Sequence, residues 1–199
     1  MNNFVKLALC TIPLLFLVSC AATKVARVET GSTIDITGRW NDTDSRLVAQ
    51  EMIDDCLSQR WLYKYEENKI RPTVIVGKIT NKSHEHISVQ TFVKDIERAL
   101  LNSGKVSFVA DKTERDQIRE EKDDQSEHSS AQTKKDRYEE TGADLMLIGT
   151  INTIVDQEGG KAVVFYQVDM ELIEIESHQK VWIGDKKIKK FVKRAKTKF

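Results

Sequence analysis

The spacing of hydrophobic residues along this chain changes between helical and strand-like, and each change marks an element. Between residues 41 and 61 the apolar positions recur every three or four residues, as on one face of a helix. Asn41 or Asp42 can cap this helix, because a short side-chain oxygen accepts a free N–H of the first turn. Residues 88–102 carry a second such stripe, and Gly104 follows as a left-handed stop. The pattern predicts two amphipathic helices.

The strand-like runs lie between and after these helices. Residues 73–79 are rich in β-branched side chains, typical of a central strand, and residues 105–110 predict a second strand.

The C-terminal third predicts a meander of three further strands, 144–156, 161–176 and 180–187, with a turn at 157–160. The apolar parity changes near residues 172–173, which predicts a β-bulge, since a one-residue slip would flip the faces.

The middle of the chain is polar. Asp111 and Glu114 have capping-box spacing and predict the start of a mostly solvated helix. Residues 123–132 have little to bury and predict a mobile loop. Residues 133–141 predict a resumed helix that Gly142 ends. Together the elements predict an α/β (α+β) fold, with a small central mixed β-sheet flanked by helices and a C-terminal β-meander.

The first 20 residues predict an export signal. Lys6 precedes an apolar run over residues 7–18 that is too short to cross a membrane easily, which takes about 20 residues. Leu17-Val18-Ser19-Cys20 resembles the lipobox of bacterial lipoproteins, which implies cleavage before Cys20 and lipidation of its sulfur. The alternative is an ordinary signal peptide with an accidental cysteine. We therefore expect a cleaved signal peptide at 1–19, a lipidated N-terminus with a short tether at 20–38, and a globular domain at 39–199.

Charge and cysteine content limit the classes of function that the chain can have. The formal net charge is zero, so bulk charge does not indicate nucleic-acid binding, and Cys56 would be the one thiol left after processing. Residues 186–199 hold eight basic residues and no acidic one. The apolar residues of this tail have helical spacing and predict a basic amphipathic helix: Ile188, Phe191, Val192 and Ala195. It either docks on the parent domain or lies on an anionic membrane or a polyanionic wall.

No enzyme signature is present, so we predict no catalytic residue, cofactor or metal. His84 and His86 are the one tempting cluster, because residues two apart in an extended segment share a face. A metal site would need His128 or His178 as a third ligand; the alternative is a polar loop.

Two groups of residues are candidates for binding a partner. Arg115, Arg119 and Glu120 lie together on the predicted polar helix, where they form either a solvated face or a partner patch. The second group precedes the first helix: Arg39, Trp40, Asp42 and Asp44. Here the alternative is that Trp40 simply packs onto that helix.

Four runs carry a family resemblance. ERDQIREE at 114–121 and GADLMLIGTI at 142–151 resemble envelope domains that include CsgG and the N-terminal domain of TolB. GRWNDTDSR at 38–46 and VWIGDKKI at 181–188 resemble the LpoB family of penicillin-binding protein activators.

This resemblance implies a TolB N-terminal-domain-like fold and an outer-membrane lipoprotein that faces the periplasm. It implies a protein that binds and stimulates a class A penicillin-binding protein and catalyses nothing itself. We expect a monomer with no nucleic-acid partner. The alternative is a CsgG-like structural or secretion lipoprotein that oligomerises in the outer membrane. The short tether departs from enteric members of the family, whose tethers are long and often proline-rich.

Overall fold

The structure is a computed structural model that describes residues 24–136 and 139–193. The chain divides into two compact units, Met1–Ser32 and Thr33–Phe199. In the described part of the first unit, the Ser32 N–H donates to the carbonyl of Glu29 at 3.0 Å. All the helices and strands of the described residues belong to the second unit. The expected signal peptide at 1–19 and the lipidation of Cys20 fall outside the described residues.

The first helix, α1 (Asp42–Leu57), begins at the predicted cap. The Asn41 side chain accepts from the Asp44 N–H, and the Asp44 carboxylate accepts from the Asn41 N–H, so two free donors are satisfied. The helix ends four residues earlier than the expected Trp61. A 3₁₀ turn, η1 (Arg60–Leu62), and a short helix, α2 (Tyr63–Glu67), follow. Trp61 is still buried, because its indole N–H donates to the Cys56 carbonyl at 2.7 Å.

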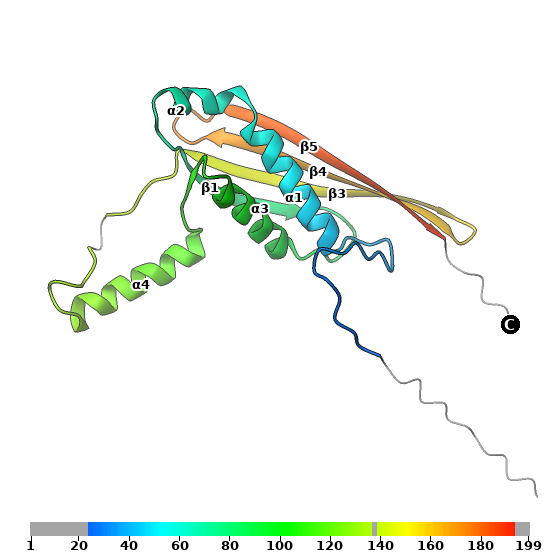
Figure 1. Ribbon diagram of the computed structural model, residues 1–199, viewed down its shortest axis with the longest axis horizontal. Coiled ribbons are helices and arrows are strands. Elements are labelled where there is room, and N and C mark those ends of the chain that lie inside the picture. Colours follow the sequence, from blue (N-terminus) through cyan, green and yellow to red (C-terminus); the bar gives the residue numbers. More distant parts are fainter. Residues whose placement is uncertain (1–23, 137–138, 194–199) are drawn as a thin grey trace, which may run out of the picture. The chain divides into compact units, whose positions relative to one another are not determined.

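The second amphipathic helix is α3 (Val89–Ser103). Its cap, Gly104, has a φ of 66°, which is the left-handed conformation expected of a glycine stop. Phe92, Ile96 and Leu100 form its buried stripe. α1 packs against both α3 and the last strand, while α3 covers the first strand, as Figure 1 shows.

A five-stranded mixed sheet has the order β2-β1-β3-β4-β5. β1 (Thr73–Asn81) pairs in parallel with β2 (Ser107–Phe108) and β3 (Leu145–Glu158). β4 (Lys161–Glu174) and β5 (Lys180–Lys193) complete an antiparallel meander with β3. The predicted α+β class, with its mixed sheet and terminal meander, is therefore confirmed.

The predicted bulge is present, but its extra residue lies on the neighbouring strand. Leu172 pairs with Trp182 and Ile173 pairs with Lys180, which leaves Val181 of β5 as the inserted residue. β4 keeps a single buried face, made by alternate residues: Val164, Tyr166, Val168, Met170 and Leu172.

The expected amphipathic helix at the C-terminus is wrong in the described part of the chain. Residues up to Lys193 continue β5, with Ile188 opposite Tyr166 and Val192 opposite Ala162. Ile188 and Val192 are four apart, so they share a face of a strand as well as of a helix. The open edge of β4 supplies backbone partners, which decides in favour of the strand. Ala195 falls outside the described residues.

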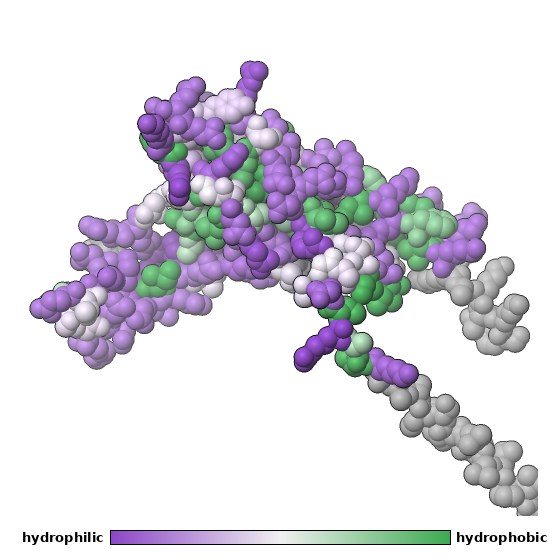
Figure 2. Space-filling model, in the orientation of Figure 1, coloured by the Kyte–Doolittle hydropathy of each residue, from purple (hydrophilic) through white to green (hydrophobic). Residues whose placement is uncertain are grey.

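The polar middle also differs from expectation. α4 (Lys112–His128) extends into the expected loop at 123–132 but ends at His128, and residues 133–136 and 139–141 are not helical. Asp111 caps α4 with the predicted box. The helix has no buried residue, and Figure 2 shows it almost entirely hydrophilic. Side-chain pairs along its length stabilise it instead, such as Arg119 with Asp116 at 2.8 Å.

Among the described residues, the buried apolar side chains lie between Val48 and Trp182, and all of them except Ile75 form one core between the helices and the sheet. A chain of residues 21–199 therefore retains the whole core. Among the described residues, no helix is both long enough and apolar enough to span a membrane.

Candidate functional site

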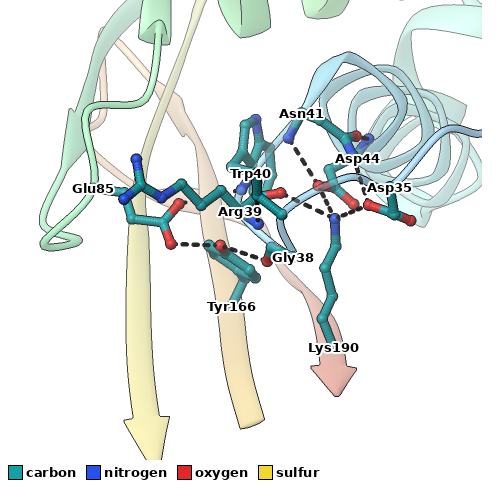
Figure 3. A network of polar contacts seen from close by, with 10 residues as sticks. Asp35, Gly38, Arg39, Trp40, Asn41, Asp44, Glu85, Tyr166 and Lys190 are labelled. Carbon is teal, nitrogen blue, oxygen red and sulfur yellow. Dashed lines mark hydrogen bonds and ion pairs between the residues drawn. The ribbon is translucent and has the colours of Figure 1, made fainter. Parts of the chain in front are cut away.

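The segment before α1 is fastened to the sheet through Glu85, as Figure 3 shows. The Trp40 N–H donates to Glu85 Oε2 at 3.2 Å. The Tyr166 hydroxyl lies 2.8 Å from Glu85 Oε1 and 3.3 Å from the Gly38 carbonyl oxygen. A hydroxyl has one proton, so the shorter contact to the carboxylate is the stronger bond. Burial and this carboxylate raise the pKa of Tyr166, so the hydroxyl stays protonated.

Trp40 adds an aromatic contact to this anchor. Its ring meets Phe92 of α3 edge-on with centroids 6.0 Å apart, and Tyr166 of β4 with centroids 5.6 Å apart. Such pairs add about 0.5–1.5 kcal/mol beyond the area they bury. Trp40 was expected to pack onto the first helix, whereas the ring contacts that it makes here are with Phe92 of α3 and Tyr166 of β4.

Lys190 of β5 fixes the same segment from the other side. Its Nζ lies 2.6 Å from Asp44 Oδ2, 2.7 Å from Asp35 Oδ1 and 3.2 Å from the Arg39 carbonyl oxygen. Burial alone would lower the pKa of Lys190, but its bonds to Asp35 and Asp44 raise it. The bond from Lys190 lowers the pKa of Asp35. The ammonium is therefore a charged link between the end of the sheet and the start of α1.

Gly38 permits this close approach. Its φ is 72°, and a Cβ at this position would collide with a methyl group of Val192. Residue 38 therefore lies directly against the C-terminal part of β5.

A cleft of about 530 Å³ opens beside the anchored segment. Arg39, the residues of the 84–86 loop and the β3–β4 hairpin line it. Its polar lining combines two basic residues, two carboxylates and two imidazoles: Arg39, Lys161, Glu85, Glu158, His84 and His86. The one thiol in the described residues, Cys56, lies elsewhere, and burial raises its pKa to about 12, so it is not a nucleophile. The cleft suits charge-assisted contacts with another molecule.

The two histidines do not come together with a third ligand. His84 Nδ1 lies 2.9 Å from the Thr153 hydroxyl. Throughout residues 24–136 and 139–193, no group of three or more His, Cys, Asp or Glu side chains is placed to hold a metal ion.

The second candidate group lies on α4. Arg115 donates to the Ala110 carbonyl at 2.9 Å, and Arg119 holds Glu140 through two bonds of 2.8 Å. These bonds lower the pKa of Glu140. Glu120 is exposed. Figure 1 places α4 apart from the start of α1, so the fold does not join the two groups into one surface.

Within the first group, the fold separates contact residues from supporting ones. Arg39 and Asp42 are exposed, Trp40 is half-buried and Asp44 is buried. Sequence reasoning missed Glu85, Tyr166, Lys190 and Asp35, which hold this segment in place. Lys190 lies between Ile188 and Val192 on the helix face of β5, and a charge between two apolar residues is the one signal that could have indicated a buried partner.

A braced, polar and open surface on a small α+β domain suits charge-assisted contacts with a partner. The family follows from the sequence: the model described as peptidoglycan-synthase activator LpoB matches residues 44–188. The chain belongs to this family.

Solved structures show similar folds. The LpoB C-terminal domain from Salmonella enterica is 16% identical, with 76% of this chain and 99% of that chain covered and a TM-score of 0.43. The LpoB C-terminal domain from Escherichia coli is 15% identical, with 73% of this chain and 98% of that chain covered and a TM-score of 0.45. Lipoprotein GNA1162 from Neisseria meningitidis is 13% identical, with 63% of this chain and 88% of that chain covered and a TM-score of 0.41. No curated protein sequence matches the chain.

Family membership supports a general role as an activator of penicillin-binding proteins in peptidoglycan synthesis. That role is regulatory rather than enzymatic, and it implies a lipoprotein that faces the periplasm. It is favoured over the CsgG-like alternative.

Proposed function

We propose that this chain is an outer-membrane lipoprotein that binds a class A penicillin-binding protein and stimulates its peptidoglycan synthesis. In this proposal residues 1–19 are removed, Cys20 carries the lipid, and the domain at 39–199 acts as a monomer. The tether at 20–38 reaches at most about 60 Å at ~3.3 Å per residue, so the synthase must come within that distance.

The family match over residues 44–188 carries this proposal, because it spans the helices and nearly all of the sheet. The braced segment supports it further. Glu85, Tyr166 and Lys190 already hold residues 38–44, so a partner meets a preformed surface and little ordering entropy opposes binding.

The mechanism we propose is a population shift. The domain binds the active conformation of the synthase better than the resting one, and stimulation is bounded by that difference in affinity. Arg39 and Asp42 make contacts on one surface, with Trp40 and Asp44 holding them in position. Arg115, Arg119 and Glu120 of α4 form a separate second contact.

The test adds residues 21–199 to class A synthases from the same cell and measures glycan polymerisation. We expect the rate of glycan polymerisation to rise with the concentration of added domain and to level off at saturation. The domain alone should form no product. Absence of stimulation for every class A synthase of the cell would refute the proposal.

Charge-reversal variants test each of the two proposed contacts separately. Arg39→Glu with Asp42→Lys, and Arg119→Glu with Glu120→Lys, should each raise the concentration for half-maximal stimulation about tenfold, which corresponds to ~1.4 kcal/mol. The matched control is Lys69→Glu, on the exposed loop after α2. A surface whose reversal changes stimulation no more than the control is not a contact.

The lipid anchor is tested in the full chain. Metabolic labelling with an alkyne fatty acid should mark the chain but not a Cys20→Ser variant, and the label should fractionate with outer membranes. Labelling that persists in the variant excludes Cys20 as the lipidated residue.

A further inference from the structure

The far end of the meander has a face that no helix covers. β1 pairs with β3 only as far as Ile151, so residues 152–158 of β3 continue with β4 and β5 alone. Figure 1 shows this three-stranded end extending past α1. The helices pack on the even-numbered residues of β4, which leaves its odd-numbered residues on the opposite face.

Apolar side chains gather on that open face. The pairing register sets Ile154, Phe165 and Lys189 side by side, and Asp156, Val163 and Phe191 in the next row. Ile154 is 67% exposed and Phe191 is 65% exposed, while Val163 and Phe165 are half-buried. Two large apolar residues thus keep about two thirds of their surface exposed, beside two that extend the same patch.

The lysines of β5 sort by face. Lys186 and Lys190 point to the helix side, where they pair with Glu51, Asp35 and Asp44. Lys189 and Lys193 point to the open face, and Lys161 lies opposite Lys193 on the same face. Within residues 24–136 and 139–193, none of these three forms an ion pair. The sequence then continues with Arg194, Lys196 and Lys198 and no acidic residue.

The tether joins the domain at this same end. Gly38 lies against Val192 on the helix face, and the neighbouring residue along β5, Phe191, points to the open face. A lipid attached at Cys20 therefore draws this end of the domain, rather than the end bearing α2, toward the membrane. Three lysines that form no ion pair among the described residues lie beside the exposed apolar residues and outnumber the two carboxylates of the same rows, Asp156 and Glu158. Exposed apolar residues with an excess of lysines are the composition that binds an anionic membrane surface.

We propose that the open face of β3–β5 around Phe191 is a second membrane contact, which docks on anionic phospholipid of the membrane that holds the lipid anchor. Ile154 and Phe191 enter the headgroup region, while Lys161, Lys189 and Lys193 lie at the phosphates. The cleft beside Arg39 shares Lys161 with this end of the hairpin, but other strand residues that line it, such as Val164 and Val192, lie on the helix face. The idea uses the proposed anchor to orient the domain, but no property of the synthase.

The experiment measures sedimentation of residues 21–199 with vesicles, so neither the lipid anchor nor a synthase contributes. We expect binding to phosphatidylethanolamine vesicles that contain phosphatidylglycerol, weak binding to phosphatidylcholine vesicles, and loss of binding at high salt. Lys189→Glu with Lys193→Glu should weaken binding at least ~30-fold, since each lysine near an anionic surface contributes roughly fivefold. Phe191→Ser should weaken it about tenfold.

The matched control for Phe191 is Ile183→Ser, because Ile183 is 67% exposed on the same strand and face but at the other end. Lys112→Glu with Lys134→Glu controls for net charge, and circular dichroism confirms folding of each variant. Absence of binding to anionic vesicles overturns the proposal, as does equal loss in the control variants. Sedimentation velocity showing a dimer that Phe191→Ser dissolves, or capture by peptidoglycan sacculi without vesicle binding, would assign the face to another occupant. A failed synthase assay leaves all of these outcomes unchanged.

Discussion

Replacing Lys190 by methionine tests whether a nearly buried charge holds the binding segment in place. The Lys190 side chain is 11% exposed and that of Asp44 is 9% exposed, with Nζ and Oδ2 2.6 Å apart. Methionine keeps most of the volume but removes the cation, so the Asp44 carboxylate loses its charge partner.

The expected cost follows from what Asp44 retains. Breaking a buried ion pair costs about 3–5 kcal/mol, because the remaining charge is uncompensated. Asp44 Oδ2 still accepts from the Asn41 N–H at 2.9 Å, and Asp35 is 46% exposed and can be solvated. We therefore expect a loss of about 2–4 kcal/mol in the free energy of unfolding.

Urea unfolding of residues 21–199 at pH 7 measures this loss, provided that the slope of the transition is unchanged. Lys186→Met is the matched control on the same strand and face. Lys186 pairs with Glu51, whose side chain is 60% exposed, so the control should lose no more than about 1 kcal/mol.

The pH dependence separates charge pairing from simple packing. The pKa of Asp35 is lowered in the folded state, so its contribution is present above its unfolded value of about 3.9 and is lost as the pH falls through the folded value. The pKa of Lys190 is raised, so its contribution persists up to about pH 10. The gap between wild type and Lys190→Met should narrow below pH 4. Equal losses in the two lysine variants, or a gap that is constant down to pH 3, would refute the reasoning.

Three further predictions concern single residues. Gly38→Ala should lower stability by about 1–3 kcal/mol in thermal unfolding, through a positive φ and a collision with Val192; Gly31→Ala, with open space around it, should change nothing. Cys56 should resist a thiol reagent at pH 8 in the folded chain and react at once in urea, because its pKa is about 12; fast labelling of the folded chain contradicts this. Asp111→Ala should reduce helical circular dichroism while costing about 1 kcal/mol or less, since α4 has no buried residue; a large loss of global stability would show that α4 supports the core.

Local signals in the sequence predicted most of the fold. Asn41 and Asp111 are short polar residues three positions before an acidic one, and both capping boxes form. The alternation in β4 identified its buried face, and the parity change marked the bulge. These features depend on neighbours within a few residues, which the sequence displays directly.

The errors occurred where two structures fit one local pattern. Ile188 and Val192 share a face in a strand and in a helix, and only the unpaired edge of β4 selects the strand. α4 lacks an apolar stripe, so hydrophobic spacing could not reveal that ion pairs carry the helix to His128. The brace from Glu85 to Tyr166 joins residues 81 positions apart, and no local pattern reports such a contact.

The position of β5 at the edge of the sheet also affects how two molecules of the protein can associate. β5 ends the sheet and carries six lysines in 14 residues. A second molecule that paired its β5 with this edge strand would bring lysine ammonium groups next to one another. Their repulsion discourages edge-to-edge strand pairing. With the lipid anchor proposed at Cys20, molecules held in one membrane would meet at high local concentration, where an unprotected sheet edge would nucleate aggregates. The lysines of β5, some of which form ion pairs within the domain, thus also disfavour association with a second molecule.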